Sequence, residues 1–73
     1  MTQTTTTLGE LLGLARELRK ITLREAERIT GISNPMISQY ECGRSEPSFR
    51  NAVALCDAYN LKLERLANTV REP

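Results

Sequence analysis

The stretch TLREAERITGISNPMISQYECG, residues 22–43, contains the features that decide the fold. Thr22 and Glu25 have the spacing of a capping box, in which the threonine oxygen and the glutamate carboxylate each satisfy a backbone N–H at a helix start. The helix that follows is expected to run to about Thr30. Gly31 is its expected stop, because glycine adopts the left-handed conformation after a last turn without a Cβ clash.

A second short helix is expected directly after this turn. Ser33 is placed to cap its start, and Pro35 falls within its first turn, where a missing backbone N–H does no harm. Gly43 marks its expected end. The stretch therefore predicts two short helices joined by a tight turn at residues 31–33.

Two helices joined in this way match the geometry of a helix-turn-helix, whose turn sets the helices at a steep angle and projects the second one outward. A projecting helix fits the DNA major groove, which is about 12 Å wide and displays a distinct donor and acceptor pattern for every base pair. Ile37 and Tyr40 share the inward side of this helix. The opposite side carries short, neutral side chains suited to base edges: Asn34, Pro35, Ser38, Gln39 and Cys42.

Three more helices are expected around this pair. A capping box at Thr7 and Glu10 begins the first, which is expected to run to about Lys20. Ser48 caps the next, and Asn60 is its expected left-handed stop. The apolar positions of these two helices are Leu8, Leu11, Leu12, Ala15, Leu18, Phe49, Ala52, Val53, Leu55, Cys56 and Tyr59, all expected in the core. A short last helix is expected after Leu61, with Leu63, Leu66 and Val70 as its apolar positions. The fold class is therefore all-α, with five helices in one domain, residues 7–70, between a polar arm, residues 1–6, and a tail, residues 71–73.

Composition narrows the function. The formal net charge is +1, so any contact with DNA has to come from local clustering of charge. Two cysteines and no histidine indicate neither a metal site nor a disulfide framework, and a reducing cytoplasm is the expected location. No apolar run is long enough for a membrane helix. No constellation for catalysis and no phosphate-binding loop is present, so neither an enzyme nor a cofactor is expected.

The segment GISNPMISQYECGR, residues 31–44, resembles the Cro/C1-type repressors, also called XRE-like helix-turn-helix proteins. It matches their Gly-aliphatic-Ser turn and their Glu-x-Gly helix end. Pro47-Ser48 and residues 63–66 are similar to the later helices of the family. The resemblance covers roughly residues 8–66. It implies a lambda-repressor-like domain that binds double-stranded DNA and regulates transcription, as a small phage- or bacterial-type repressor that occupies an operator as a homodimer through its C-terminal helices.

The resemblance also implies roles for individual residues. Gln39 is the first candidate for base contact, because glutamine can form a bidentate pair with adenine. Arg16 and Glu41 would pair to join the first helix to the third. The base-contacting candidates are Asn34, Pro35, Ser38, Gln39 and Cys42. The candidates for contact with the DNA backbone are Arg24, Ser33 and Arg44, and the structural residues are Arg16, Glu41, Gly31 and Gly43. Arg19 and Arg28 are expected to be solvated surface residues.

Glu27 departs from the family pattern, in which a small alanine usually stands four residues before the turn glycine. Two interpretations are open. Either the second helix is rotated so that Ile29 fills the core, or its crossing with the third helix is looser than usual.

The alternative function is a protein-interaction module on the same fold, antitoxin-like or dependent on a protein partner, with DNA binding secondary. The low net charge, Glu27 and the prospect of an exposed Ile29 favour this alternative. An exposed apolar patch around Ile29 or Val70 would support it.

Overall fold

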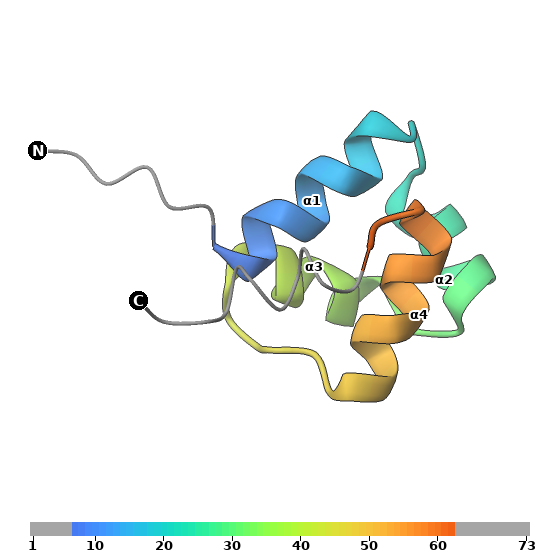
Figure 1. Ribbon diagram of the computed structural model, residues 1–73. Helices are drawn as coiled ribbons and strands as arrows, with labels where there is room; N and C mark the ends of the chain where they lie inside the picture. The colour runs from blue at the N-terminus through green and yellow to red at the C-terminus, as the bar shows by residue number, and fades with distance from the viewer. Residues whose placement is uncertain (1–6, 63–73) are drawn as a thin grey trace, which may run out of the picture.

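Four α-helices make up the part of the chain that the computed structural model describes, residues 7–62. They are α1 (Leu8–Leu18), α2 (Leu23–Thr30), α3 (Asn34–Cys42) and α4 (Phe49–Tyr59) (Figure 1). Within these residues there is no strand, and the all-α prediction is confirmed. The expected fifth helix, the arm and the tail lie outside the described residues.

The helix starts follow from local capping chemistry. At α1 and α2, the Thr7 and Thr22 hydroxyls accept hydrogen bonds from the Glu10 and Glu25 N–H groups at 3.1 and 3.0 Å, and both capping boxes are complete. The Ser48 hydroxyl accepts from a backbone N–H in the first turn of α4. Each cap satisfies donors that have no partner within the helix.

The helix ends depend on residues in the left-handed conformation. Gly31, Gly43 and Asn60, with φ of 82°, 81° and 56°, end α2, α3 and α4 as the sequence predicts. The end of α1 differs from the prediction. Lys20 itself is left-handed, with φ of 57°, and the Ile21 N–H donates to an α1 carbonyl, so this helix closes at Leu18.

The helices pack crosswise around one core. α3 contacts α1 and α2, and α4 also contacts α1 and α2. In Figure 1, α1 runs above α3, and α4 crosses in front of α2. The buried apolar side chains are Leu12, Ala15, Ala26, Ile32, Ile37, Tyr40, Ala52, Leu55, Cys56 and Tyr59.

Two residues expected in the core are exposed. Leu18 is 81% exposed because it is six residues, or about 120° around the helix, away from the direction of Leu12, at the centre of the buried stripe of α1. Phe49 is 75% exposed. It is the first residue of α4, and since helical side chains lean toward the N-terminus, it projects past the helix end.

α1 and α3 approach each other closely at Gly9. A Cβ atom built on this residue would lie 2.3 Å from the Tyr40 carbonyl oxygen and 2.9 Å from the Glu41 carbonyl oxygen. Glycine therefore sets the distance between α1 and the helix that projects from the domain. None of the helices within residues 7–62 is long and apolar enough to cross a lipid bilayer.

Candidate nucleic-acid interface

The interface candidate is built on α3, which is fixed to the domain from its inner side. Ile37 and Tyr40 are buried, as the sequence predicts. The Tyr40 hydroxyl accepts a hydrogen bond of 2.8 Å from the Asn51 side-chain amide of α4. At the helix start the Ser33 hydroxyl accepts from the Met36 N–H at 3.4 Å, and Pro35 lies in the first turn.

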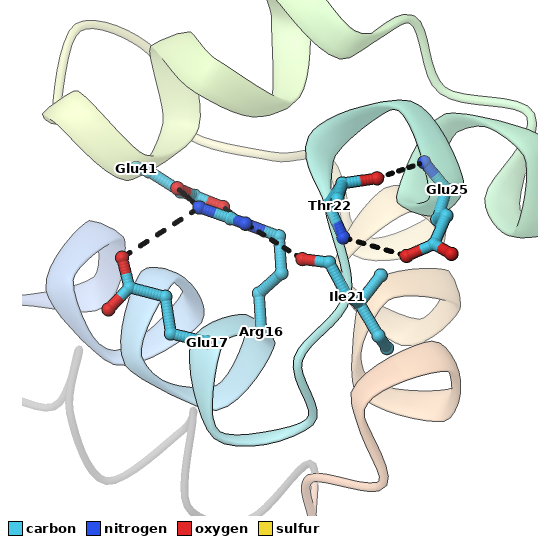
Figure 2. A network of polar contacts seen from close by, with 6 residues as sticks. All are labelled: Arg16, Glu17, Ile21, Thr22, Glu25 and Glu41. Carbon is cyan, nitrogen blue, oxygen red and sulfur yellow. Dashed lines mark hydrogen bonds and ion pairs between the residues drawn. The ribbon is translucent and has the colours of Figure 1, made fainter.

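An ion pair fixes the other end of α3 to α1. Arg16 Nε and Nη2 donate to the two Glu41 carboxylate oxygens at 2.7 and 3.0 Å, and the two side chains are only 14% and 15% exposed. Arg16 Nη1 also donates to the Ile21 carbonyl at 2.8 Å, so one guanidinium joins α1, α3 and the α1–α2 connection (Figure 2). The hydrogen bond to Glu41 raises the pKa of Arg16, while burial acts in the opposite direction. This bidentate geometry holds the projecting helix in a defined orientation.

The outward side of α3 carries the predicted neutral residues. Pro35, Gln39 and Cys42 are exposed, whereas Asn34 and Ser38 are half-buried. No charged side chain stands among these five, so a base edge would meet hydrogen-bonding and apolar groups only.

Gln39 has a hydrogen-bond partner that was not predicted from the sequence. The Ser45 hydroxyl, in the loop after α3, donates to Gln39 Oε1 at 3.2 Å. This contact turns the side-chain NH2 of Gln39 away from Ser45. No local pattern identifies Ser45, because the contact depends on how the chain folds back after Gly43.

Asn34 is hydrogen-bonded to Glu27, a residue for which the sequence predicted no contact. Glu27 Oε1 accepts from Asn34 Nδ2 at 2.7 Å and from the Asn34 N–H at 3.3 Å. The departure of Glu27 from the family pattern was the available signal. The structure also shows that Ile29 does not fill the core, since it is 55% exposed, and the interpretation that it does is wrong. Ala26 is the fully buried residue of α2 instead.

Exposed arginine side chains lie on α2 and directly after α3. Arg24 is exposed in the first turn of α2, and Arg44 is exposed directly after the C-terminal cap of α3. The backbone N–H of Arg44 donates to the Gln39 carbonyl at 2.9 Å, which fixes the start of the loop. Arg28 is exposed, and so is Arg19, whose Nε donates to the Tyr59 carbonyl at the end of α4.

The two cysteines are not joined to each other. Cys42 is exposed and Cys56 is buried in the core, where burial raises the pKa of its thiol. In the part of the chain that the structure describes, no three histidine, cysteine or acidic residues come together as a metal site would require.

Comparison with known proteins identifies the family. A family model described as helix-turn-helix matches residues 12–66, and the chain belongs to this family. The resemblance to Cro/C1-type proteins is thereby confirmed.

Solved structures of two regulators are similar to the chain. One is the P22 c2 repressor in complex with a synthetic operator, with 32% identity over 89% of this chain and 94% of the other, at a TM-score of 0.78. The solution structure of the P22 c2 DNA-binding domain has 31% identity over 89% and 86%, at a TM-score of 0.82. The clp gene regulator ClgR from Corynebacterium glutamicum has 25% identity over 93% and 72%, at a TM-score of 0.80. No curated protein sequence matches the chain.

Proposed function

We propose that this protein is a sequence-specific double-stranded DNA-binding regulator of transcription, a small phage- or bacterial-type repressor that acts by occupying an operator. The observation that carries the proposal is the neutral, hydrogen-bonding outer side of α3, with exposed Arg24 and Arg44 on the elements next to it. The similarity to the P22 c2 repressor, solved with an operator, supports it.

In this mechanism α3 enters the major groove, and binding is the whole of the action. Gln39 contacts a base, and with Nε2 and Oε1 it can form a bidentate pair with adenine, worth about 1–3 kcal/mol of discrimination. Arg24 and Arg44 bind phosphates, which fix the register of the protein on the duplex without selecting sequence. Ser33 and the α3 N-terminus face the same backbone.

The functional unit that we propose is a homodimer. Proteins of this docking mode bind two half-sites about 34 Å apart, one helical turn of DNA, through a two-fold axis that places both projecting helices on one side of the duplex. The C-terminal segment after α4 is the proposed contact between the two copies.

The experiment that tests the function is selection of bound duplexes from a random pool, followed by titration of the winning sequence. The expected result is a palindromic motif. Gln39→Ala is expected to lose about 1–3 kcal/mol at one base pair of each half-site. Gln39→Glu, which retains acceptors and lacks donors, is expected to lose adenine at that position while folding equally well. If no motif rises above salt-sensitive background, the proposal is wrong.

A second candidate, a protein-interaction module with a protein partner, is favoured by one observation. Ile29 is 55% exposed near the end of α2, outside the proposed DNA-facing helix. The two candidates are separated by the variant Ile29→Ser. If its affinity for DNA equals that of wild type and a palindrome is enriched, the repressor is favoured over the protein-interaction module.

A further inference from the structure

We infer that Glu27 sets the base preference of Asn34 by fixing the orientation in which the Asn34 side-chain amide meets the DNA. The inference rests on the proposed function and deepens it. Glu27 is a positioning residue in this account, because it acts on the DNA only through Asn34.

The contact joins the two helices of the motif. Glu27 is in the penultimate turn of α2, and Asn34 is the first residue of α3. One carboxylate oxygen, Glu27 Oε1, accepts both the side-chain Nδ2 at 2.7 Å and the backbone N–H at 3.3 Å of Asn34. Both residues are half-buried, so water competes less for these bonds than it would on an open surface.

The position of Asn34 is the one where base contacts are made in this class of motif. The N-terminal residues of a recognition helix lie deepest against base edges when that helix enters the major groove. A free asparagine at such a place can form a bidentate pair with adenine, in which Nδ2 donates to N7 and Oδ1 accepts from N6.

The chemistry of a carboxylate fixes which way that pair faces. An ionised carboxylate has acceptors only, so the asparagine amide has to turn its NH2 group, and not Oδ1, toward Glu27. One N–H of the NH2 group is then engaged, and the second N–H and Oδ1 are left for DNA. These are the two groups that bond adenine N7 and N6. Asn34 in this protein is therefore held in the orientation that selects adenine, whereas an unrestrained asparagine can also turn its amide over and present its groups to other bases.

Substitutions of Glu27 separate its hydrogen bonding from its charge. Glu27→Ala removes the acceptor and releases the Asn34 amide. Glu27→Gln removes the same negative charge, while its Oε1 still accepts from Asn34 Nδ2. Any general gain in affinity from losing a carboxylate near phosphates is shared by both variants, so it does not mimic a change in base preference.

The test is selection of bound duplexes from a random pool with four proteins: wild type, Glu27→Ala, Glu27→Gln and Asn34→Ala. The base pair that Asn34 contacts is the one whose preference disappears in Asn34→Ala. At that pair, wild type and Glu27→Gln are expected to prefer adenine. Glu27→Ala is expected to lose about fivefold or more of that preference.

The side-chain resonances of the free protein provide a readout that needs no DNA. The Asn34 NH2 signals, assigned by their loss in Asn34→Ala, are expected to exchange with water more slowly than those of exposed Asn60. An Asn34 amide that exchanges as fast as Asn60 would overturn the inference, whether or not Glu27→Ala folds. An equally strong preference for adenine at this pair in wild type and Glu27→Ala would overturn the inference alone. Absence of enrichment with all four proteins would overturn the proposed function, and this inference with it.

Discussion

Gly9 and Gly13 lie one turn apart on the side of α1 that meets α3, yet only Gly9 is required to be glycine. A Cβ at Gly9 would lie 2.3 Å from a backbone oxygen of α3, whereas a Cβ at Gly13 would be in ordinary contact with the Glu41 side chain at 3.4 Å. Gly9→Ala is expected to reduce the free energy of unfolding by about 1–3 kcal/mol, because the helices have to move apart. Chemical denaturation measures this change.

Gly13→Ala is the matched control. Within a helix alanine is favoured over glycine by about 0.5–1 kcal/mol, and nothing at Gly13 opposes this gain, so the variant is expected to be as stable as wild type or more stable. Equal stability of the two variants would contradict the close approach at Gly9.

Tyr59 links the stability of the fold to pH. It is 1% exposed, and its hydroxyl has no hydrogen-bond partner within residues 7–62. Burial raises the pKa of Tyr59 to about 12, and the charge of Glu41 adds to this effect, while Arg16 opposes it. In the unfolded chain the phenol ionises near pH 10. The unfolded state therefore loses its proton first, and stability that is complete below pH 10 is expected to fall by on the order of 2 kcal/mol as the pH rises to 12.

Absorbance at 295 nm in a Tyr40→Phe background follows the ionisation of Tyr59 alone, since these are the two tyrosines of the chain. Denaturation of Tyr59→Phe at pH 9 and pH 11 is the control, and this variant is expected to lose less stability over that interval than wild type. A phenol in folded protein that titrates near pH 10 would rule out this origin of the alkaline instability.

Among the elements, the helix boundaries other than the end of α1 were predictable because their signals are local. The capping boxes at Thr7 and Thr22, and the left-handed residues Gly31, Gly43 and Asn60, act within one turn of the chain. Such chemistry is nearly independent of tertiary structure.

The contacts between elements were only partly predictable. The buried positions of α1 depend on which side faces α3 and α4, and an apolar pattern that includes Leu18 does not define that direction closely enough. The pairs Glu27–Asn34 and Gln39–Ser45 each cross a turn whose path is set by the packing of α3. The family resemblance predicted the pair between Arg16 and Glu41 because this pair recurs in the family. Glu27 is unusual for the family, so the resemblance implied no contact for it.

The end of α1 contains a position where a substitution is expected to increase the stability of the fold. Lys20 holds a left-handed φ of 57°, a conformation that costs a residue with a Cβ about 1–2 kcal/mol. Lys20→Gly is expected to raise the free energy of unfolding by about 0.5–1 kcal/mol, after the greater flexibility of glycine in the unfolded chain is included. Thermal denaturation would detect this as a rise of a few degrees. Asn60→Gly is the control, with a smaller expected gain because asparagine tolerates this conformation. A lower melting temperature for Lys20→Gly would show that its side chain contributes more than its backbone costs.

For the whole molecule, a net charge of +1 means that attraction to DNA depends on where a few cations stand. If Arg24 and Arg44 each neutralise one phosphate per subunit, replacing either by alanine is expected to reduce the magnitude of the slope of log affinity against log salt by about 1.8 for the proposed dimer, with the selected motif unchanged. Titration of the selected duplex at several salt concentrations measures the slope.

Arg28→Ala is the control for this experiment, because it removes the same charge from an exposed position of α2 that is not proposed to face DNA. Its slope is expected to equal that of wild type. A uniform change for all three variants would indicate that net charge, and not the placement of Arg24 and Arg44, governs binding.

The ion pair between Arg16 and Glu41 also has a direction. Arg16 donates at once to the carboxylate and to the Ile21 carbonyl, so the cation belongs on α1. With the two residues exchanged, a carboxylate on α1 would face that carbonyl, and two acceptors would meet without a proton between them. Charge complementarity alone would therefore not rescue a reversed pair. An evolving protein that lost Arg16 could regain the contact between α1 and α3 only by restoring arginine at the same position. The residues at positions 16 and 41 are therefore expected to be kept or lost together during evolution.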